Sequence, residues 1–167
     1  IKNISHILSA ISLTNLCDTH LKNFILGYGE IWSAQIVTAV LRSHQFDAAF
    51  MNAAEILCVD DTQSPIWVDW EKSNQKLLGF IGKTNKSVYV ITGFIAGNEE
   101  GQRTILGLNC SDYSASIFAK LLSATQLVIW TDVSGVYSAN PQEVKVAKQI
   151  KSLSYKEALE LAYFGAS

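Results

Sequence analysis

The spacing of apolar residues predicts helices in the first quarter of the chain. Ile4, Ile7, Leu8 and Ile11 recur at the period of an α-helix. A second helix is expected from Asp18, which is placed to cap its N terminus, to Leu26. Gly27-Tyr28-Gly29 should interrupt it, because glycine is a poor helix former, and a further helix should then run from Glu30 to about His44.

Beyond His44 the period shortens to that of strands. Short strands are predicted at residues 47–51 and 56–59, and a helix in the middle of 68–86. The continuous apolar runs 88–92 and 127–131 predict strands buried on both faces. Between them, 94–96 and 104–106 flank a turn rich in Gly and Asn and predict a hairpin.

Two helices complete the pattern. The first is expected at residues 111–123, with Ser111 as its N-cap. The second runs from Ser154 to about Tyr163, and Glu157 completes a capping box at its start. The repeated order of strand, crossover helix and strand predicts a mostly parallel α/β sheet with helices on both sides.

Ligands of such sheets bind outside the carboxyl ends of the strands, which selects three places: Gly93, the loop 107–112, and Thr131-Asp132. The loop opens a helix, whose free N–H groups suit a phosphate or a carboxylate, although Ser111 could simply cap that helix. Asp132 could bind a nucleotide or a metal, or form an Asx-turn before Gly135. Glu30 lies in the first turn after the predicted helix restart, where a glutamate commonly interacts with the helix dipole, so by itself it is a weak signal for function.

Composition narrows the class of protein. The chain has 167 residues, 49% hydrophobic and 17% charged, with a net charge of −2, as expected for one globular domain. No basic block indicates nucleic acid. Cys17, Cys58 and Cys110 form no CxxC pair and share no metal-ligand spacing with the histidines, which argues against disulfides and zinc. We also find no apolar stretch near the roughly 18 residues that cross a membrane and no signal peptide, so we expect the cytoplasm.

Several strings, taken in order and spacing, resemble one family. They are GFIAGNE at 93–99, GLNCSDYSA at 107–115 and IWTDVSGVY at 129–137. This combination is similar to the aspartate kinases. SYKEA at 154–158 and ELAYFGA at 160–166 are similar to the branch fused to homoserine dehydrogenase. The likeness extends over essentially the whole chain.

The resemblance implies the amino-acid kinase fold, a three-layer α/β/α sandwich, and transfer of a phosphoryl group from ATP to the side-chain carboxylate of L-aspartate with Mg²⁺. By position in the family's motifs, Glu30 would lie near the substrate amino group. Ser111 and Asp112 would lie beside substrate and phosphates, as catalytic residues, with Ser111 also binding substrate. Thr131, Asp132 and Tyr137 would bind the nucleotide. No metal-binding residue is assigned.

Several departures from the family pattern replace basic side chains with uncharged ones. In the family's G-R-x-G-S-D loop, Leu108 replaces the Arg and Cys110 replaces a Gly; Asn140-Pro141-Gln142 replaces D-P-R, and Ser167 replaces the Lys of F-G-A-K. The missing Arg would have clamped a carboxylate in a bidentate way. Losing one oriented electrostatic donor commonly lowers the rate about a hundredfold or more, so we expect this chain alone to be inactive.

The sequence therefore predicts one partial aspartokinase catalytic domain over 1–167, without the family's N-terminal K-F-G-G-T-S segment and without a regulatory or dehydrogenase region. An exposed sheet edge would favour a homo-oligomer. The main alternative is a degenerate, non-catalytic module that binds a nucleotide or a partner. A sibling kinase acting on glutamate or a nucleoside monophosphate is disfavoured by the S-D-Y-S-A string at 111–115 and by the start of the last helix.

Overall fold

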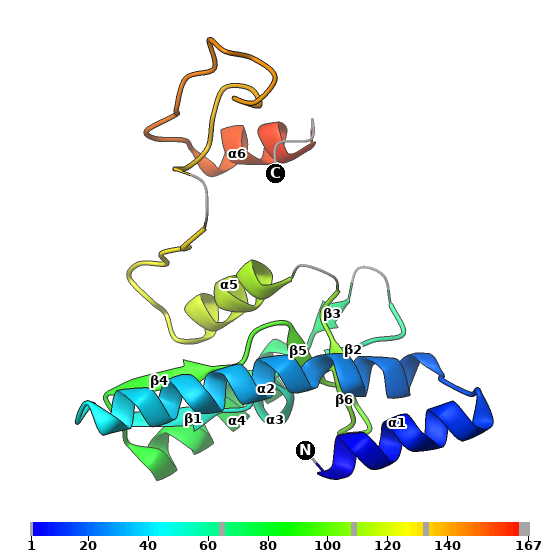
Figure 1. Ribbon diagram of the computed structural model, residues 1–167. Helices are drawn as coiled ribbons and strands as arrows, with labels where there is room; N and C mark the ends of the chain where they lie inside the picture. Colours follow the sequence, from blue (N-terminus) through cyan, green and yellow to red (C-terminus); the bar gives the residue numbers. More distant parts are fainter. Residues whose placement is uncertain (1, 64–65, 108–109, 132–133, 164–167) are drawn as a thin grey trace. The chain divides into compact units, whose positions relative to one another are not determined.

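The computed structural model describes residues 2–63, 66–107, 110–131 and 134–163 (Figure 1). It divides the chain into two compact units, Ile1–Leu127 and Val128–Ser167. The first unit contains all the described strands and the helices α1 to α5, and the second contains α6.

Two helices open the first unit, α1 (Lys2–Thr14) and α2 (Thr19–Ser43). The predicted cap of α2 is confirmed, since Oδ1 of Asp18 accepts a hydrogen bond from the Leu21 N–H at 2.7 Å. The predicted interruption at 27–29 is wrong, because α2 continues without a break to Ser43.

Close packing explains why a glycine lies in the interior of α2. A Cβ placed on Gly27 would lie 2.8 Å from Cδ of Arg103 and 2.9 Å from Cγ2 of Ile95. Gly27 is therefore the position at which α2 approaches the β5–β6 hairpin, formed by Ile95–Gly97 and Arg103–Ile105. Helix packing against strands overrides the weak helix propensity of glycine.

The parallel pair at the centre of the unit joins β1 (Ala48–Met51) to β4 (Val88–Ile91), with Met51 opposite Ile91. The crossover between them contains α3 (Ala53–Ile56), β2 (Val59–Asp60), β3 (Trp67–Val68) and α4 (Trp70–Thr84). β2 pairs with β3, and β5 with β6, in the antiparallel sense. The predicted hairpin is thus confirmed, whereas the strand expected at 56–59 begins only at Val59 because α3 occupies 53–56.

The hydrophobic core lies between these strands and α3, α4 and α5 (Ser111–Leu121). Its most deeply buried side chains are Met51, Leu57, Leu77, Ile95 and Ile117. α2 packs on β1, β4 and β6, and Figure 1 shows it running alongside β1 and β4 and crossing β6. The strand expected at 88–92 is present, but all four residues of β4 are only half-buried.

The second predicted buried strand, at 127–131, is not formed. Its residues take no regular structure, and the Trp130 side chain is 92% exposed. No described strand forms a ladder with this segment, and a strand without a neighbour cannot satisfy its backbone groups. The apolar pattern predicts that the side chains at 127–131 are buried, but no described strand covers them.

The second unit bears out the last predicted helix, α6 (Tyr155–Tyr163). Its capping box is present. The Ser154 N–H donates to Oε2 of Glu157 at 2.7 Å, and the Glu157 N–H donates back to Oγ of Ser154 at 3.3 Å. An antiparallel bridge between Tyr137 and Gln149 ties the loop that precedes this helix.

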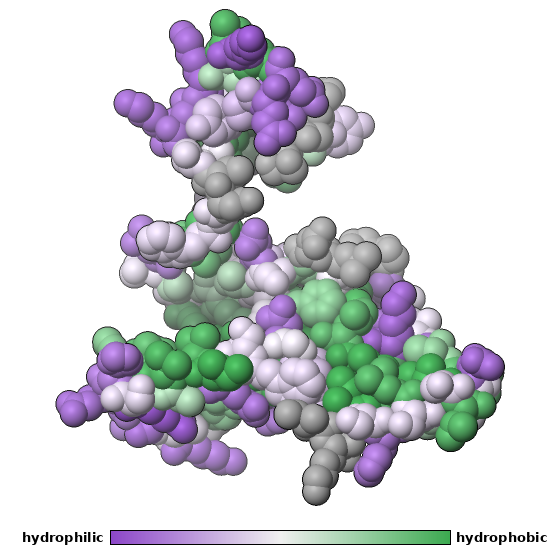
Figure 2. Space-filling view, viewed as in Figure 1, coloured by the Kyte–Doolittle hydropathy of each residue, from purple (hydrophilic) through white to green (hydrophobic). Residues whose placement is uncertain are grey.

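One helix contradicts the expectation that no apolar stretch could cross a membrane. α2 has 25 residues and an 18-residue window with a mean hydropathy of 1.4, of which 17% is buried, so it qualifies by length and composition. Leu26, Ile36, Val37 and Val40 of α2 are exposed, and Figure 2 shows hydrophobic surface along this helix. A single such helix is weak evidence for a membrane, and the opposite face of α2 packs on strands.

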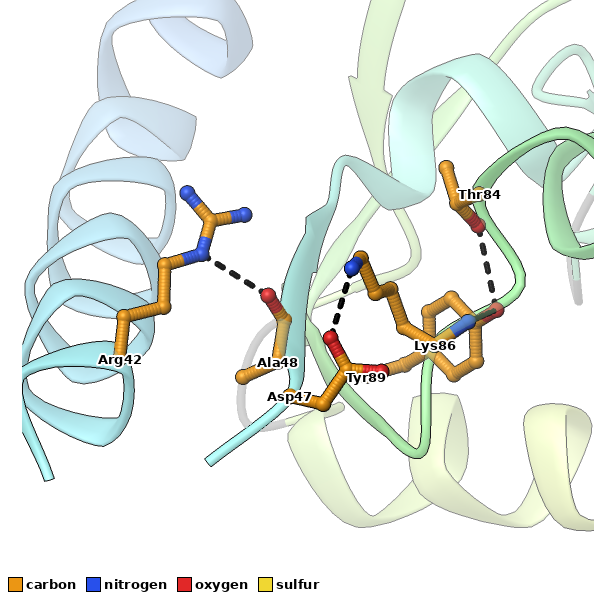
Figure 3. A network of polar contacts seen from close by, with 6 residues as sticks. All are labelled: Arg42, Asp47, Ala48, Thr84, Lys86 and Tyr89. Atoms are coloured by element: carbon orange, nitrogen blue, oxygen red, sulfur yellow. Dashed lines mark hydrogen bonds and ion pairs between the residues drawn. The ribbon is translucent and has the colours of Figure 1, made fainter. Parts of the chain in front are cut away.

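A polar network fixes the amino ends of β1 and β4 (Figure 3). Nζ of Lys86 lies 2.6 Å from Oδ1 of Asp47, directly before the two strands. Nε of Arg42, near the end of α2, donates to the Ala48 carbonyl at 2.8 Å. The hydroxyl of Tyr89 accepts from the Lys86 N–H at 2.9 Å and lies 3.1 Å from Oγ1 of Thr84. The register of the parallel pair is thus held at the end remote from Gly93.

Replacing Gly27 with alanine should destabilise the chain. The new methyl group would overlap Arg103 and Ile95, and overpacking of this kind lowers the free energy of unfolding by about 1–3 kcal/mol. Urea unfolding followed by circular dichroism measures the change. Gly29→Ala is the matched control, because a Cβ at Gly29 meets nothing within 4 Å. It should raise the free energy of unfolding by about 0.5–1 kcal/mol through helix propensity. Equal effects at both positions would contradict the packing role of Gly27.

The Asp47–Lys86 pair should make stability depend on pH in the acid range. The hydrogen bond and charge of Lys86 lower the pKa of Asp47 below its ordinary value of 3.8. A carboxyl whose pKa is depressed by folding stabilises the fold above its unfolded pKa, and this contribution is lost as the pH falls through the folded pKa. The difference in unfolding free energy between the native chain and Asp47→Asn should therefore be constant near neutrality and shrink below about pH 4.

Urea unfolding at pH 7, 5, 4 and 3 tests this prediction. Asp61→Asn is the control, because Asp61 has no hydrogen bond or ion pair within the described part of the chain. A difference for Asp47→Asn that grew on acidification would refute the assignment.

Candidate functional site

The carboxyl ends of β1 and β4 leave the sheet side by side. Met51 is opposite Ile91 in the ladder, and the Thr92 N–H donates to the Met51 carbonyl at 3.1 Å. Oγ1 of Thr92, which is 1% exposed, accepts from the Ala53 N–H at 2.8 Å. Asn52 caps α3 at the same edge by accepting from the Ala54 N–H. The edge expected to bind ligands is thus built from the ends of two parallel strands.

A strained turn follows β4. The Ile95 N–H donates to the Gly93 carbonyl at 2.6 Å, which closes a three-residue γ-turn around Phe94. Phe94 has a φ of +65°, a value that non-glycine residues rarely adopt. Strained residues of this kind persist only where the surrounding structure fixes them, and they are frequent at functional sites. The turn connects β4 to β5 and lies directly beside α5.

Ser114 provides the contact that fixes this turn against α5. Its side chain is buried, and its Oγ accepts from the Phe94 N–H at 2.7 Å and donates to the Cys110 carbonyl at 3.0 Å. The Ser114 N–H donates to the same carbonyl at 2.9 Å. One hydroxyl therefore joins the strained turn after β4 to the first turn of α5.

This contact brings two of the predicted places together. A Cβ on Gly93 would lie 3.4 Å from both Cβ and Oγ of Ser111. Ser111 and Asp112 are exposed in the first turn of the 11-residue helix α5. The absence of a side chain on Gly93 leaves the N terminus of α5 open to the end of β4, where an anion would meet free N–H groups.

Ser111 is not the N-cap that its position suggested. Cys110 occupies the cap position and makes no side-chain capping bond, so Ser111 is the first helical residue. Its hydroxyl has no hydrogen-bond partner within the described residues and is available to a ligand. Gly107 has a φ of +130°, and a Cβ there would lie 3.1 Å from Sγ of Cys110, so Gly107 lies close to the Cys110 side chain.

Glu30 lies within α2, where it is half-buried. In the part of the chain that is described, no hydrogen bond or ion pair engages its carboxylate, which is therefore available to a cationic group. Its closeness to Ser111 and Asp112 stays a prediction.

The predicted nucleotide-binding residues belong to the second unit. Thr131 is exposed, and Tyr137 is half-buried and bridged to Gln149. Asp132 lies outside the described residues, as do Leu108 and Ser167. Gln142 is exposed, and its N–H donates to Oδ1 of Asn140 at 3.0 Å. The roles that the family's motifs imply for Glu30, Asp112 and Asp132 would require these carboxylates to meet near one cleft, and this stays a prediction.

Sequence reasoning missed two contributors to this edge, Phe94 and Ser114. Neither carries a signal that could have identified its role, because a positive φ at Phe94 and a buried hydroxyl bridge at Ser114 depend on contacts between distant segments. Thr92 and Asn52 could have been found from the predicted strands, because Thr92 ends the strand predicted at 88–92 and Asn52 directly follows the one predicted at 47–51. Within the described residues, no group of three His, Cys, Asp or Glu side chains could hold a metal ion by itself.

Comparison with known proteins agrees with this architecture. The sequence profile of the amino acid kinase family matches residues 5–167. The bifunctional aspartokinase/homoserine dehydrogenase 1 of Arabidopsis thaliana chloroplasts is 39% identical over 168 residues, covering 100% of this chain and 18% of the relative. The bifunctional enzyme of Buchnera aphidicola is 35% identical over 165 residues, covering 98% of this chain and 20% of the relative. The chain thus spans about a fifth of the length of these relatives.

A solved structure supports the fold prediction. Escherichia coli aspartokinase III, in complex with aspartate and ADP, superposes with a TM-score of 0.88 at 29% identity, covering 99% of this chain and 37% of that chain. An isopentenyl phosphate kinase shares the fold alone, with a TM-score of 0.54 at 18% identity. The predicted α/β fold, with a parallel sheet and helices, is confirmed. The chain therefore belongs to the amino acid kinase family and is homologous to its aspartokinase domains.

Proposed function

We propose that this chain is part of an aspartate kinase and that the whole protein carries out the following reaction. An oxygen of the L-aspartate side-chain carboxylate attacks the γ-phosphorus of ATP, the bond from that phosphorus to the β–γ bridging oxygen breaks, and ADP leaves with 4-phospho-aspartate as the other product. This would be the first step of lysine, threonine and methionine biosynthesis. The observation that carries the proposal is the open N terminus of α5, with Ser111 beside Gly93 at the carboxyl end of β4.

The residues of this edge suit the tasks of phosphoryl transfer, which are mainly positioning and stabilisation of charge. The N–H groups of the first turn of α5 and the Ser111 hydroxyl would hold phosphate or carboxylate oxygens. Glu30 would accept hydrogen bonds from the substrate ammonium group. Thr131, Asp132 and Tyr137 would contact the nucleotide. The strained turn at Phe94 would keep the edge in place without reorganisation on binding.

Mg²⁺ would be held through the nucleotide rather than by a cage of protein ligands. Mg²⁺ is commonly bound by one or two carboxylates together with substrate phosphates and water. Asp112 is exposed at the start of α5 and fits the role of a single carboxylate contact. When bound, the ion would neutralise charge on the phosphates.

Two departures within the chain lead us to propose that it does not turn over by itself. Leu108 and Gln142 stand where the family pattern has arginines. The substrate carboxylate and the triphosphate together bring several negative charges to an edge that offers mainly N–H dipoles. The alternative is a degenerate module that retains nucleotide or partner binding without catalysis, and the same two departures favour it.

An oligomer of the intact protein is also part of the proposal. Exposed apolar side chains lie on α2 and at 127–131, including Ile36, Val40 and Trp130. Association between copies would remove such surface from water.

Calorimetric titration of Mg-ATP and of L-aspartate into this chain tests the proposed site. Mg-ATP should bind with saturation, and Asp132→Ala should abolish the heat. L-Aspartate should bind weakly, and Leu108→Arg should strengthen its binding by about tenfold or more, because a bidentate guanidinium would meet the substrate carboxylate. Leu108→Gln is the matched control, since it adds a polar side chain without charge.

The outcomes separate the two functions. Binding of both ligands, with phosphoryl transfer in the full-length protein, supports the kinase. Mg-ATP binding without any response of aspartate to Leu108→Arg supports the degenerate module. If Mg-ATP does not bind at all, the proposed site is wrong, even though the fold would be retained.

Replacing Ser114 with alanine should weaken both the fold and the site. The Phe94 N–H and the Cys110 carbonyl would lose the hydroxyl between them, and an unsatisfied buried polar group lowers the free energy of unfolding by about 1–3 kcal/mol. Ser116→Ala is the control, because the exposed Ser116 hydroxyl bonds only the Asp112 carbonyl, and it should change stability by less than about 0.5 kcal/mol. Urea unfolding measures both. Equal stability of the two variants would exclude the bridging role.

A further inference from the structure

A second pocket lies at the closed end of the β5–β6 hairpin, remote from Gly93 and Gly107 at its open end. Its volume is about 450 Å³. The walls come from the start of α2, with Asp18, His20, Leu21 and Phe24, and from the turn, with Gly101, Gln102 and Arg103. None of these residues takes part in the proposed kinase chemistry.

Arg103 enters this pocket in a fixed position. Its guanidinium lies 4.3 Å from the ring centroid of Phe24 and 4.7 Å from that of Tyr28, and one terminal nitrogen donates to the Phe24 carbonyl at 3.0 Å. Close contact with Gly27 holds its aliphatic stem. Stacking and a backbone bond thus restrict the side chain before any ligand arrives.

The guanidinium has no acidic partner within the described residues. Neither of the two ion pairs found there involves Arg103, which is half-buried. One of its nitrogens is used by Phe24, so donors of the guanidinium fork remain for an acceptor in the pocket. A planar carboxylate is the group that this fork matches best.

Asp18 supplies an opposite charge to the same pocket. One of its carboxylate oxygens caps α2 through the Leu21 N–H, which leaves the second oxygen available. Glu99 and Glu100 are exposed on the adjoining turn, so a phosphate or a dicarboxylate would meet additional negative charge. A ligand that carries one carboxylate and one ammonium group balances Arg103 and Asp18 without this penalty.

We propose that the pocket binds a free α-amino acid as its zwitterion, with the carboxylate on Arg103, the ammonium group on Asp18, and the side chain against Leu21 and Phe24. Binding pockets typically combine apolar walls with a few charged groups that fix orientation, and this one follows that pattern. The volume of the pocket accommodates a molecule of this size.

Backbone amide NMR of the chain tests the proposal, with each of the twenty L-amino acids as a titrant. At least one should produce saturable shifts at 18–21 and 101–103. Asp18→Asn, which can still cap α2, and Arg103→Gln should each weaken this binding by about tenfold or more, because each removes a charged hydrogen bond. Arg103→Lys keeps the charge but not the fork and should bind less tightly than the native chain. Shifts at 110–114 would instead report the proposed kinase site, so the two proposals fail separately.

Acetate, methylamine and inorganic phosphate are the comparison ligands, and none should match the amino acid. Equal shifts with acetate or phosphate would show a simple anion site and overturn the proposal. So would the absence of saturable shifts at these amides with all twenty amino acids, or binding that Asp18→Asn leaves unchanged. Thermal unfolding by circular dichroism accompanies each variant. If Arg103→Gln is unfolded, Asp18→Asn and the native titrations still decide the result.

Discussion

The geometry of the proposed kinase edge depends on one buried hydroxyl. Ser114 joins the Phe94 N–H to the Cys110 carbonyl and so ties the end of the parallel pair to the start of α5. Phe94 could not keep a positive φ in isolation, because the conformation is unfavourable for a side chain with a Cβ. The hydrogen bond from Ser114 and the bond from the Leu106 N–H to the Phe94 carbonyl, at 2.8 Å, compensate for that strain. Ser111 faces Gly93 as a consequence of these bonds.

A second constraint places α2 on the strands. Gly27 allows the helix to approach Ile95 and the stem of Arg103, and the aromatic side chains of Phe24 and Tyr28 then cover the guanidinium. Phe24, Tyr28 and Trp32 follow one another along one side of α2, with ring centroids 5.3 and 5.4 Å apart. The same contact therefore seats the helix that carries Glu30 and orients the arginine of the second pocket.

Local patterns predicted the elements whose signals lie within a few residues. Such signals predict the Asp18 cap, the capping box of Ser154 and Glu157, the hairpin and the strand at 88–91. Most of the failures concern contacts between distant segments. Gly27 packs against Arg103 and Ile95, which are distant in sequence, and the run at 127–131 pairs with no described strand. The strained turn at Phe94 is of the same kind. Ser111 differs, because it lies one residue inside the helix that Cys110 begins.

The two ends of the β5–β6 hairpin differ in the charge that they offer. At the open end, Ser111 lies beside Gly93 in the first turn of α5, and Leu108 stands where the family pattern has an arginine, so an anion there relies on helix dipoles. At the closed end, Arg103 is a positioned cation without an acidic partner in the described part of the chain. Dipoles of one helix end are equivalent to roughly half a charge, which is much less than a triphosphate carries. Phosphoryl transfer at the open end therefore requires more positive charge than the first turn of α5 supplies, whereas a neutral zwitterion at the closed end can be balanced by Arg103 and Asp18.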